Sequence, residues 1–214
     1  VNWLTERTKE HDTAGEMTMA NGLFEKGAIT GIGETAYTRG SGKSDVALQM
    51  EASLKAIADA GLKPSDIDGV VPYAAGAAVA EDFITNFNLP DVRFSATTPL
   101  GGASCVAAIQ AAVTAVAVGL ANHVLIPIGR NGYSGGRIGD RVQQMPQFRA
   151  IGEFEMPLGT LAPAQLYSHM ARRHMEMYGT KSEHFAKIAM TVRKHAAMND
   201  NALRQEPMSL EDHQ

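Results

Sequence analysis

The residues of this chain whose types and spacing best suit chemistry form a short glycine turn before an alanine-rich segment. The turn reads Pro99-Leu100-Gly101-Gly102-Ala103-Ser104-Cys105-Val106, and the residues that follow, up to Val118, are almost all apolar. If this segment is a buried helix, its first N–H groups and the positive end of its dipole suit an oxyanion or a thiolate. Alternatively, the glycines permit close packing and Ser104 caps the helix. The residues alone leave both interpretations open.

Thiol and imidazole side chains give little further evidence for a site. Cys105 is the only cysteine, so it forms no disulfide within the chain, and in an apolar helix we expect it to be an inert core residue. Among the seven histidines, His169 and His174 are spaced so that they point away from each other on a helix, and no His-Glu-x-x-His pattern occurs. The sequence therefore predicts no metal site.

Two glycine motifs look like nucleotide-binding sites and do not meet the full requirements. Gly31-Ile32-Gly33-Glu34-Thr35-Ala36 matches a dinucleotide fingerprint, but the helix that must begin within that turn is delayed by residues 37–43. Gly40-Ser41-Gly42-Lys43-Ser44 resembles a phosphate loop, but Tyr37 stands where its first glycine is required. We therefore expect no resident nucleotide cofactor.

The elements that position the glycine turn follow an alternating order. Short apolar runs predict strands at 27–33, 69–73, around 92–94 and at 124–129, and helical spacing predicts helices at 44–60, 103–118, 163–178 and 182–198. In the first helix the apolar positions are Val46, Leu48, Met50, Leu54, Ile57 and Ala58, and Ser182 is expected to cap the last. The segment 103–118 has hardly a polar face, which predicts a helix buried on all sides. Residues 130–162 read as a long functional loop.

Composition sets the class of protein. The 214 residues are 44% hydrophobic and 20% charged, with a net charge of -4, which fits a globular α/β protein and disfavours nucleic acid as a partner. The longest apolar stretch, 106–120, is too short and too interrupted to cross a membrane. The first residues lack a secretory pattern, so we expect a cytoplasmic protein.

Three segments together resemble the N-terminal half of the thiolase superfamily, and most closely its sterol-carrier or lipid-transfer branch. They are Ala28-Ile29-Thr30-Gly31-Ile32-Gly33-Glu34-Thr35, then residues 58–70, and then the glycine turn with its helix up to Gly119. Tyr178-Gly179-Thr180 and the region 195–202 resemble the later helices of that branch. The resemblance implies a layered α/β/α half with a buried central helix and a loop region. It divides the chain into an extension (1–26), the thiolase-like half (27–129) and loop region with helices (130–214), with the C-terminal half absent.

One departure from the family pattern decides the expected reaction. Thiolases carry Cys-x-Ser-Gly at the start of the buried helix, and aligning Ala108 and Gly119 with the family places Gly102 where the nucleophilic cysteine belongs. Thiolase-like aldolases also lack that cysteine, and the resemblance implies retro-aldol cleavage of a β-hydroxyacyl-CoA in lipid or steroid side-chain degradation, with tyrosines of the second half taking part. A 3-ketoacyl-CoA thiolase (acetyl-CoA C-acyltransferase) and a non-catalytic acyl-CoA-binding or scaffold subunit remain as alternatives.

The resemblance also implies site residues and partners. Gly102, Ala103 and Ser104 would form a backbone site for the thioester oxygen. Arg130, Asn131 and Tyr133 follow the end of a strand, where α/β sheets present ligand groups, although loop capping is an equal interpretation. Arg137, Arg141 and Arg149 would meet the phosphates of CoA, which enters as part of the substrate. A homodimer and an OB-fold acyl-CoA-binding partner protein are expected.

Overall fold

The computed structural model describes residues 25–72, 78–133, 149–160 and 162–213, and predicted site residues Arg137 and Arg141 lie outside them. The chain divides into two compact units, of which the first holds the described residues of 25–34 and 49–129 and the second those of 35–48 and 130–213. The division predicted from the sequence, at residues 26 and 129, stays a prediction. None of the described helices is long and apolar enough to cross a membrane.

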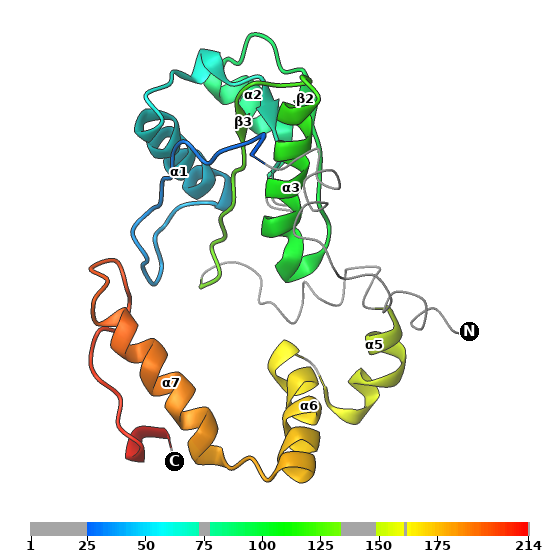
Figure 1. The fold of residues 1–214 in the computed structure, drawn as a ribbon, viewed down its shortest axis with the longest axis vertical. Coiled ribbons are helices and arrows are strands. Elements are labelled where there is room, and N and C mark those ends of the chain that lie inside the picture. Colours follow the sequence, from blue (N-terminus) through cyan, green and yellow to red (C-terminus); the bar gives the residue numbers. More distant parts are fainter. Residues whose placement is uncertain (1–24, 73–77, 134–148, 161, 214) are drawn as a thin grey trace, which may run out of the picture. The chain divides into compact units, whose positions relative to one another are not determined.

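A small parallel sheet organises the first unit. Its strands are β1 (Gly69–Val70), β2 (Phe94–Ser95) and β3 (Val124–Leu125), in the order β2-β1-β3. Helix α3 (Ser104–Ala117) connects β2 with β3, as predicted, and α2 (Ala80–Phe87), which was not among the predicted helices, connects β1 with β2. Figure 1 shows the strands between α1 (Asp45–Asp59) and α3, so the predicted α/β class with helical layers is confirmed.

The core of this unit lies between the sheet, α1 and α2. It consists of buried side chains from all three, namely Ile57, Ile67, Val70, Phe83, Leu89 and Leu125. On α1 the buried residues are Gln49, Ser53 and Ile57, while Leu54 is 48% exposed. The helix itself was predicted, but its buried face includes two polar residues, Gln49 and Ser53, that the apolar pattern did not include.

Helix α3 is covered on one face only. Ser104, Ala108, Ala112 and Ala115 are buried and recur at helical spacing, whereas Val106 is 70% exposed. The expectation of a helix buried on all sides is therefore wrong for this chain, because Val118 is also 63% exposed. The helix ends as expected at Gly119, whose φ of +75° suits glycine.

The predicted first strand is not a strand. Residues 27–33 run extended without a neighbouring strand among the described residues, and Ile29 and Ile32 are 72% and 75% exposed. The segment instead lies tightly on α1. A Cβ at Gly31 would come within 2.3 Å of the Ala56 carbonyl oxygen, and one at Gly33 within 2.3 Å of the Ala52 carbonyl oxygen. The glycines of the apparent dinucleotide fingerprint are therefore explained by close backbone packing.

Asp68 joins the starts of all three strands. Its carbonyl oxygen accepts the Arg93 N–H at 2.8 Å, just before β2. Its carboxylate accepts the backbone N–H groups of Asn122 and His123 at 2.8 Å each, just before β3, and the Asn122 side-chain amide at 3.0 Å. One residue at the start of β1 thus fixes both neighbouring strands.

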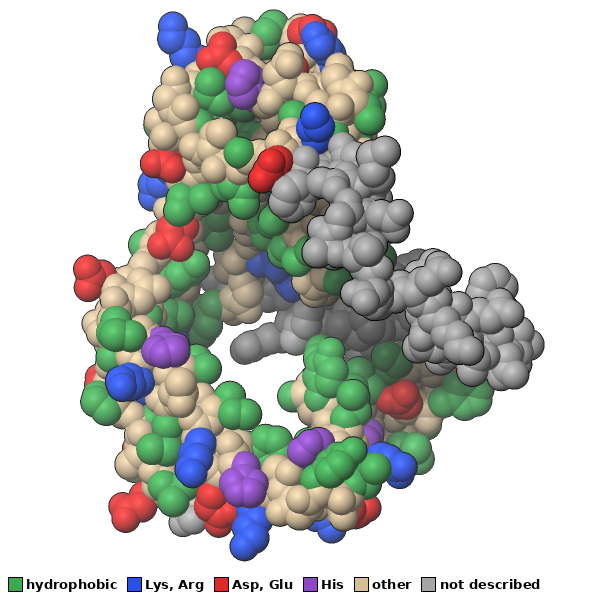
Figure 2. All heavy atoms as spheres, in the orientation of Figure 1, with side chains coloured by type: hydrophobic (Ala, Val, Ile, Leu, Met, Phe, Trp, Pro, Cys, Tyr) green, Lys and Arg blue, Asp and Glu red, His purple; other side chains and the backbone are tan. Residues whose placement is uncertain are grey.

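The second unit is helical and has almost no buried residues. Its helices are α5 (Arg149–Phe154), α6 (Pro163–Tyr178) and α7 (Ser182–Ala196). The latter two match the prediction, although the cap of α7 is Lys181 rather than Ser182, and α5 lies in what was predicted to be loop. Of its described residues, Thr160 and Ala186 alone are buried. Figure 2 shows hydrophobic side chains on the surface of this unit, and those of α6 include Tyr167, Met170, Met177 and Tyr178.

Candidate functional site

The glycine turn before α3 is held by two hydrogen bonds to one buried serine. Ser104 is 2% exposed, and its hydroxyl oxygen accepts the Leu100 N–H at 3.0 Å. The Thr98 hydroxyl donates to the Ser104 carbonyl oxygen, also at 3.0 Å. Between them Gly101 has a φ of +61°, which favours glycine. Ser104 therefore closes the turn onto Leu100 instead of capping the N–H groups of α3.

The two amides predicted to receive a thioester oxygen differ in availability. Gly102 and Ala103 are both exposed. The Gly102 N–H has no acceptor within the described part of the chain, and a Cβ built on Gly102 would meet no atom within 4 Å. The Ala103 N–H already donates to the Leu100 carbonyl oxygen at 3.3 Å. Of these two amides, only that of Gly102 is without an acceptor among the described residues.

Cys105 follows this turn on the first turn of α3. It is a free thiol and is half-buried. The expectation that it is a core residue is therefore not met. The side chain that follows it, Val106, is exposed. Within the described residues, no three potential metal ligands converge, and the absence of a metal stays a prediction.

Asn131 and Tyr133, two of the predicted binding residues after β3, have different environments. The Asn131 N–H donates to the Asp45 carboxylate, and its side-chain amide donates to the Lys43 carbonyl oxygen at 2.8 Å. Tyr133 is 58% exposed, and its ring lies 3.8 Å from where a Cβ on Gly40 would stand. Asn131 therefore fastens the loop, as the capping interpretation expects, while Tyr133 keeps an open ring face.

Two predicted binding arginines also differ in their environments, namely Arg130, which belongs to the same group after β3, and Arg149. The Arg130 Nε is buried and has no hydrogen-bond partner among the described residues. Arg149, expected at CoA phosphates, instead pairs with Glu153 one turn along α5, with its Nε 2.8 Å from the carboxylate. The structure thus collects Gly102, Ala103 and Ser104 in one turn of the first unit, and the residues from 130 to 133 in a loop of the second.

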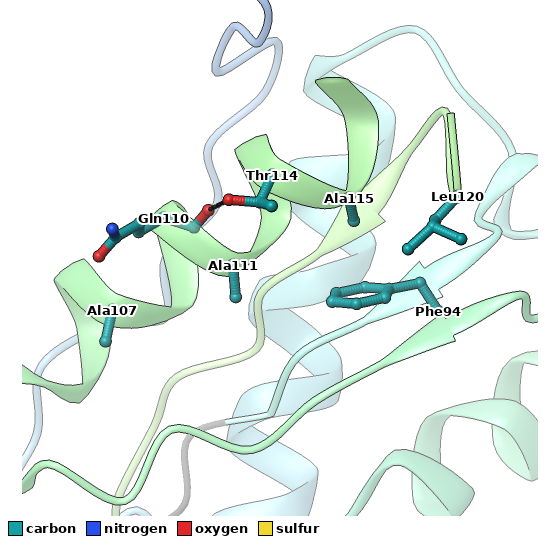
Figure 3. A pocket seen from close by; sticks show the side chains of 7 residues that line it. All are labelled: Phe94, Ala107, Gln110, Ala111, Thr114, Ala115 and Leu120. Atoms are coloured by element: carbon teal, nitrogen blue, oxygen red, sulfur yellow. Dashed lines mark hydrogen bonds between the residues drawn. The ribbon is translucent and has the colours of Figure 1, made fainter. Parts of the chain in front are cut away.

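A shallow apolar depression of about 370 Å³ lies along the middle of α3. Figure 3 shows the methyl groups of Ala107, Ala111 and Ala115 on the side of α3 that faces Phe94 and Leu120. None of the predicted site residues lines it. The depression therefore does not coincide with the candidate residues of the glycine turn in this unit.

Three structural residues around these segments were missed from the sequence. Thr98 holds the turn, and Gln49 holds Gly129 through an amide-to-carbonyl bond of 3.0 Å. Asn201 bonds to segment 35–37, donating to the Thr35 carbonyl oxygen at 3.1 Å and accepting the Tyr37 N–H at 3.0 Å. The one available signal was Gln49 itself, a polar residue within the apolar spacing of the first helix.

Comparison with known proteins identifies the relatives of this chain. It is 40% identical over 192 residues to a steroid side-chain-cleaving aldolase from Thermomonospora curvata, covering 87% of this chain and 49% of that protein. It is 34% identical to a 17-hydroxy-3-oxo-4-pregnene-20-carboxyl-CoA lyase from Mycobacterium tuberculosis, covering 90% of this chain and 51% of that protein. No family model matches the chain.

A solved structure agrees with these relatives. The chain superimposes with a TM-score of 0.76 and 39% identity on a chain of the Ltp2-ChsH2(DUF35) aldolase, covering 87% of this chain and 47% of the other. The chain thus spans about half the length of the proteins it matches. The resemblance predicted from the sequence is confirmed: the chain is a relative of the thiolase-like aldolases of the thiolase superfamily.

Proposed function

We propose that this chain provides the thioester-binding turn of an enzyme that cleaves a carbon–carbon bond in a β-hydroxyacyl-CoA by a retro-aldol reaction. The observation that carries the proposal is Gly102, which the family register places at the thiolase nucleophile, in an exposed turn where its N–H has no acceptor among the described residues. Without a thiolate at that position, an acyl-enzyme has no acceptor atom there. The names of the most similar relatives, an aldolase and a lyase, support the same reaction class.

The reaction balances without a second substrate. A base takes the proton of the β-hydroxyl, the Cα–Cβ bond breaks, and its electron pair moves onto the thioester as an enolate. The β-carbon leaves as a carbonyl compound, and protonation of the α-carbon gives a shorter acyl-CoA. The Gly102 N–H would stabilise the enolate oxygen, which carries more charge than the ground-state thioester. We propose that the base comes from the half of the relatives that this chain does not match.

The same proposal covers substrate, partners and location. The relatives' names favour a CoA thioester on a steroid side chain. A partner with an OB-fold and acyl-CoA-binding ability is supported by the DUF35 partner named in the similar structure, and a homodimer and a cytoplasmic location stay predictions. Arg130 and Tyr133 would contact the CoA part of the substrate, with Arg137 and Arg141 at its phosphates. CoA is part of the substrate, and no cofactor is proposed.

Product analysis tests the reaction. The full-length enzyme, with any partner it requires, is incubated with a β-hydroxyacyl-CoA with and without free CoA, and products are identified by mass spectrometry. A carbonyl compound and a shorter acyl-CoA should form in both cases, and a 3-ketoacyl-CoA should not be thiolysed. A strict requirement for CoA with a covalent acyl-enzyme would instead indicate a thiolase. Binding of acyl-CoA without turnover of either substrate would indicate a non-catalytic subunit.

A further inference from the structure

The buried face of α1 carries two polar side chains one turn apart. Gln49 is 0% exposed and Ser53 is 3% exposed. Burying a side-chain amide is unfavourable unless it forms hydrogen bonds. Gln49 meets this condition on one side, since its Nε2 donates to the Gly129 carbonyl oxygen at 3.0 Å. The Ser53 hydroxyl has no partner within the described residues.

Gly129 is shaped to this contact. A Cβ on residue 129 would lie 2.8 Å from Gln49 Cγ, closer than such atoms approach in proteins, and 3.6 Å from the Gln49 backbone nitrogen. Gln49 therefore lies where any side chain on residue 129 would have to go. The contact holds the backbone at Gly129 by a hydrogen bond and by close packing. Strand pairing does not hold it there, because β3 already ends at Leu125.

The chain reaches the proposed binding residues directly after this point. Arg130 follows Gly129, and Tyr133 lies three residues further along. Asn131 is fastened separately, to residues 43 and 45 just before and at the start of α1. A ligand site on a loop keeps its geometry only when the backbone beneath it is held, and displacements of about 1 Å can cost much of the binding or rate.

We propose that Gln49 is a positioning residue for acyl-CoA binding, which acts by holding Gly129 so that Arg130 and Tyr133 start from a fixed backbone. This inference rests on the proposed function for the ligand and on the structure for the contact. Ser53 provides a matched control, because it is polar, buried and on the same helix face, but lacks a bond to the loop.

The experiment compares Gln49→Leu with Ser53→Ala in the full-length enzyme, using acetyl-CoA as the binding probe and a β-hydroxyacyl-CoA as substrate. Loss of one buried hydrogen bond predicts a rise of up to about tenfold in the Kd and in KM for Gln49→Leu, with little change in kcat. Hydrogen exchange over residues 126–133 should become faster in this variant. Ser53→Ala should leave Kd, KM and exchange in that segment unchanged, even if both variants lower Tm.

The outcomes separate the inference from the proposed function. If the wild-type enzyme binds acetyl-CoA and Gln49→Leu binds it equally well with unchanged exchange at 126–133, the positioning role is wrong. If the wild type shows no binding or cleavage, the proposed function fails, while the exchange measurement still tests the contact. Should Gln49→Leu not fold, Gln49→Met serves in its place, because the unbranched methionine side chain is close to glutamine in size and cannot donate to Gly129.

Discussion

Replacing Asp68 by alanine should detach the strand starts on either side of β1. The substitution removes the carboxylate that accepts three N–H donors from Asn122 and His123, at 2.8 to 3.0 Å. Hydrogen bonds to a charged group contribute about 1.5 to 3 kcal/mol each when buried. Because Asp68 is half-exposed and water can replace part of the loss, we expect a destabilisation of about 2 to 3 kcal/mol, or about 4 to 12 °C in Tm.

The pH dependence of stability gives the same prediction a second measurement. Partial burial raises the pKa of Asp68, but hydrogen bonds from His123 and Asn122 and the nearby Arg93 outweigh it and hold the pKa below its usual 3.8. The unfolded chain binds this proton more tightly than the folded chain. The contribution of Asp68 is therefore complete above about pH 4 and is lost as the pH falls through the lower folded-state value. Asp68→Asn should show a weaker loss of stability over that acidic range.

Calorimetry of the full-length protein checks both effects, with Asp91→Asn as the control. Asp91 is an exposed carboxylate whose contact with Arg93, at 3.4 Å, is a surface ion pair of little energetic value. If Asp68→Ala lowers Tm no more than Asp91→Asn, the idea that Asp68 fixes the sheet is refuted.

Four further outcomes follow from the site and the exposed surface. Replacing Arg137 and Arg141 by alanine should weaken CoA-thioester binding about tenfold, or about 1.4 kcal/mol, in calorimetric titrations; unchanged affinity would remove both from the site. Alkylation of the half-buried Cys105 with iodoacetamide should leave the activity unchanged, because the register places Gly102 and not Cys105 at the nucleophile position; inactivation on alkylation would contradict that register. Ser104→Ala should destabilise the protein by about 0.5 to 1.5 kcal/mol in denaturant unfolding, because the Leu100 N–H loses the Ser104 hydroxyl and keeps only the Thr98 carbonyl oxygen as acceptor. The 214-residue chain alone should be inactive and should associate, because one face of α3 exposes apolar side chains; a monodisperse monomer in analytical ultracentrifugation would argue otherwise.

The sequence predicts best those elements whose ends carry a local signal. Helix α6 begins at Pro163, which suits a first helical position, and ends before Gly179, whose φ is +65°. Its predicted bounds are those observed because both signals act within one turn. The N-cap of α7 was predicted one residue too late, at Ser182. The observed cap is Lys181, whose N–H donates to the side chain of His184, and the sequence does not reveal that bond.

Features that depend on distant residues were not predicted. A strand at 27–33 requires a neighbouring strand, which local apolar character cannot reveal. The buried face of α1 was inferred from apolar spacing, yet Gln49 is enclosed because Gly129, 80 residues away, leaves room for it. In the glycine turn, the residue types singled out the segment as a candidate, but the role of Thr98 depends on a bond that only the folded turn shows.

The close packing of Gly31 and Gly33 on α1 affects how such sequences are classified. Any larger residue would collide with carbonyl oxygens of Ala56 or Ala52, so close packing alone should make both glycines tolerate almost no substitution. A sequence search for nucleotide-binding fingerprints would score this pair as a cofactor site. A mutational scan would find both glycines intolerant of substitution, and this result could be mistaken for support of that assignment. Distinguishing the two cases requires the position of the next helix, which begins here at Asp45, too late to meet a pyrophosphate at the glycines.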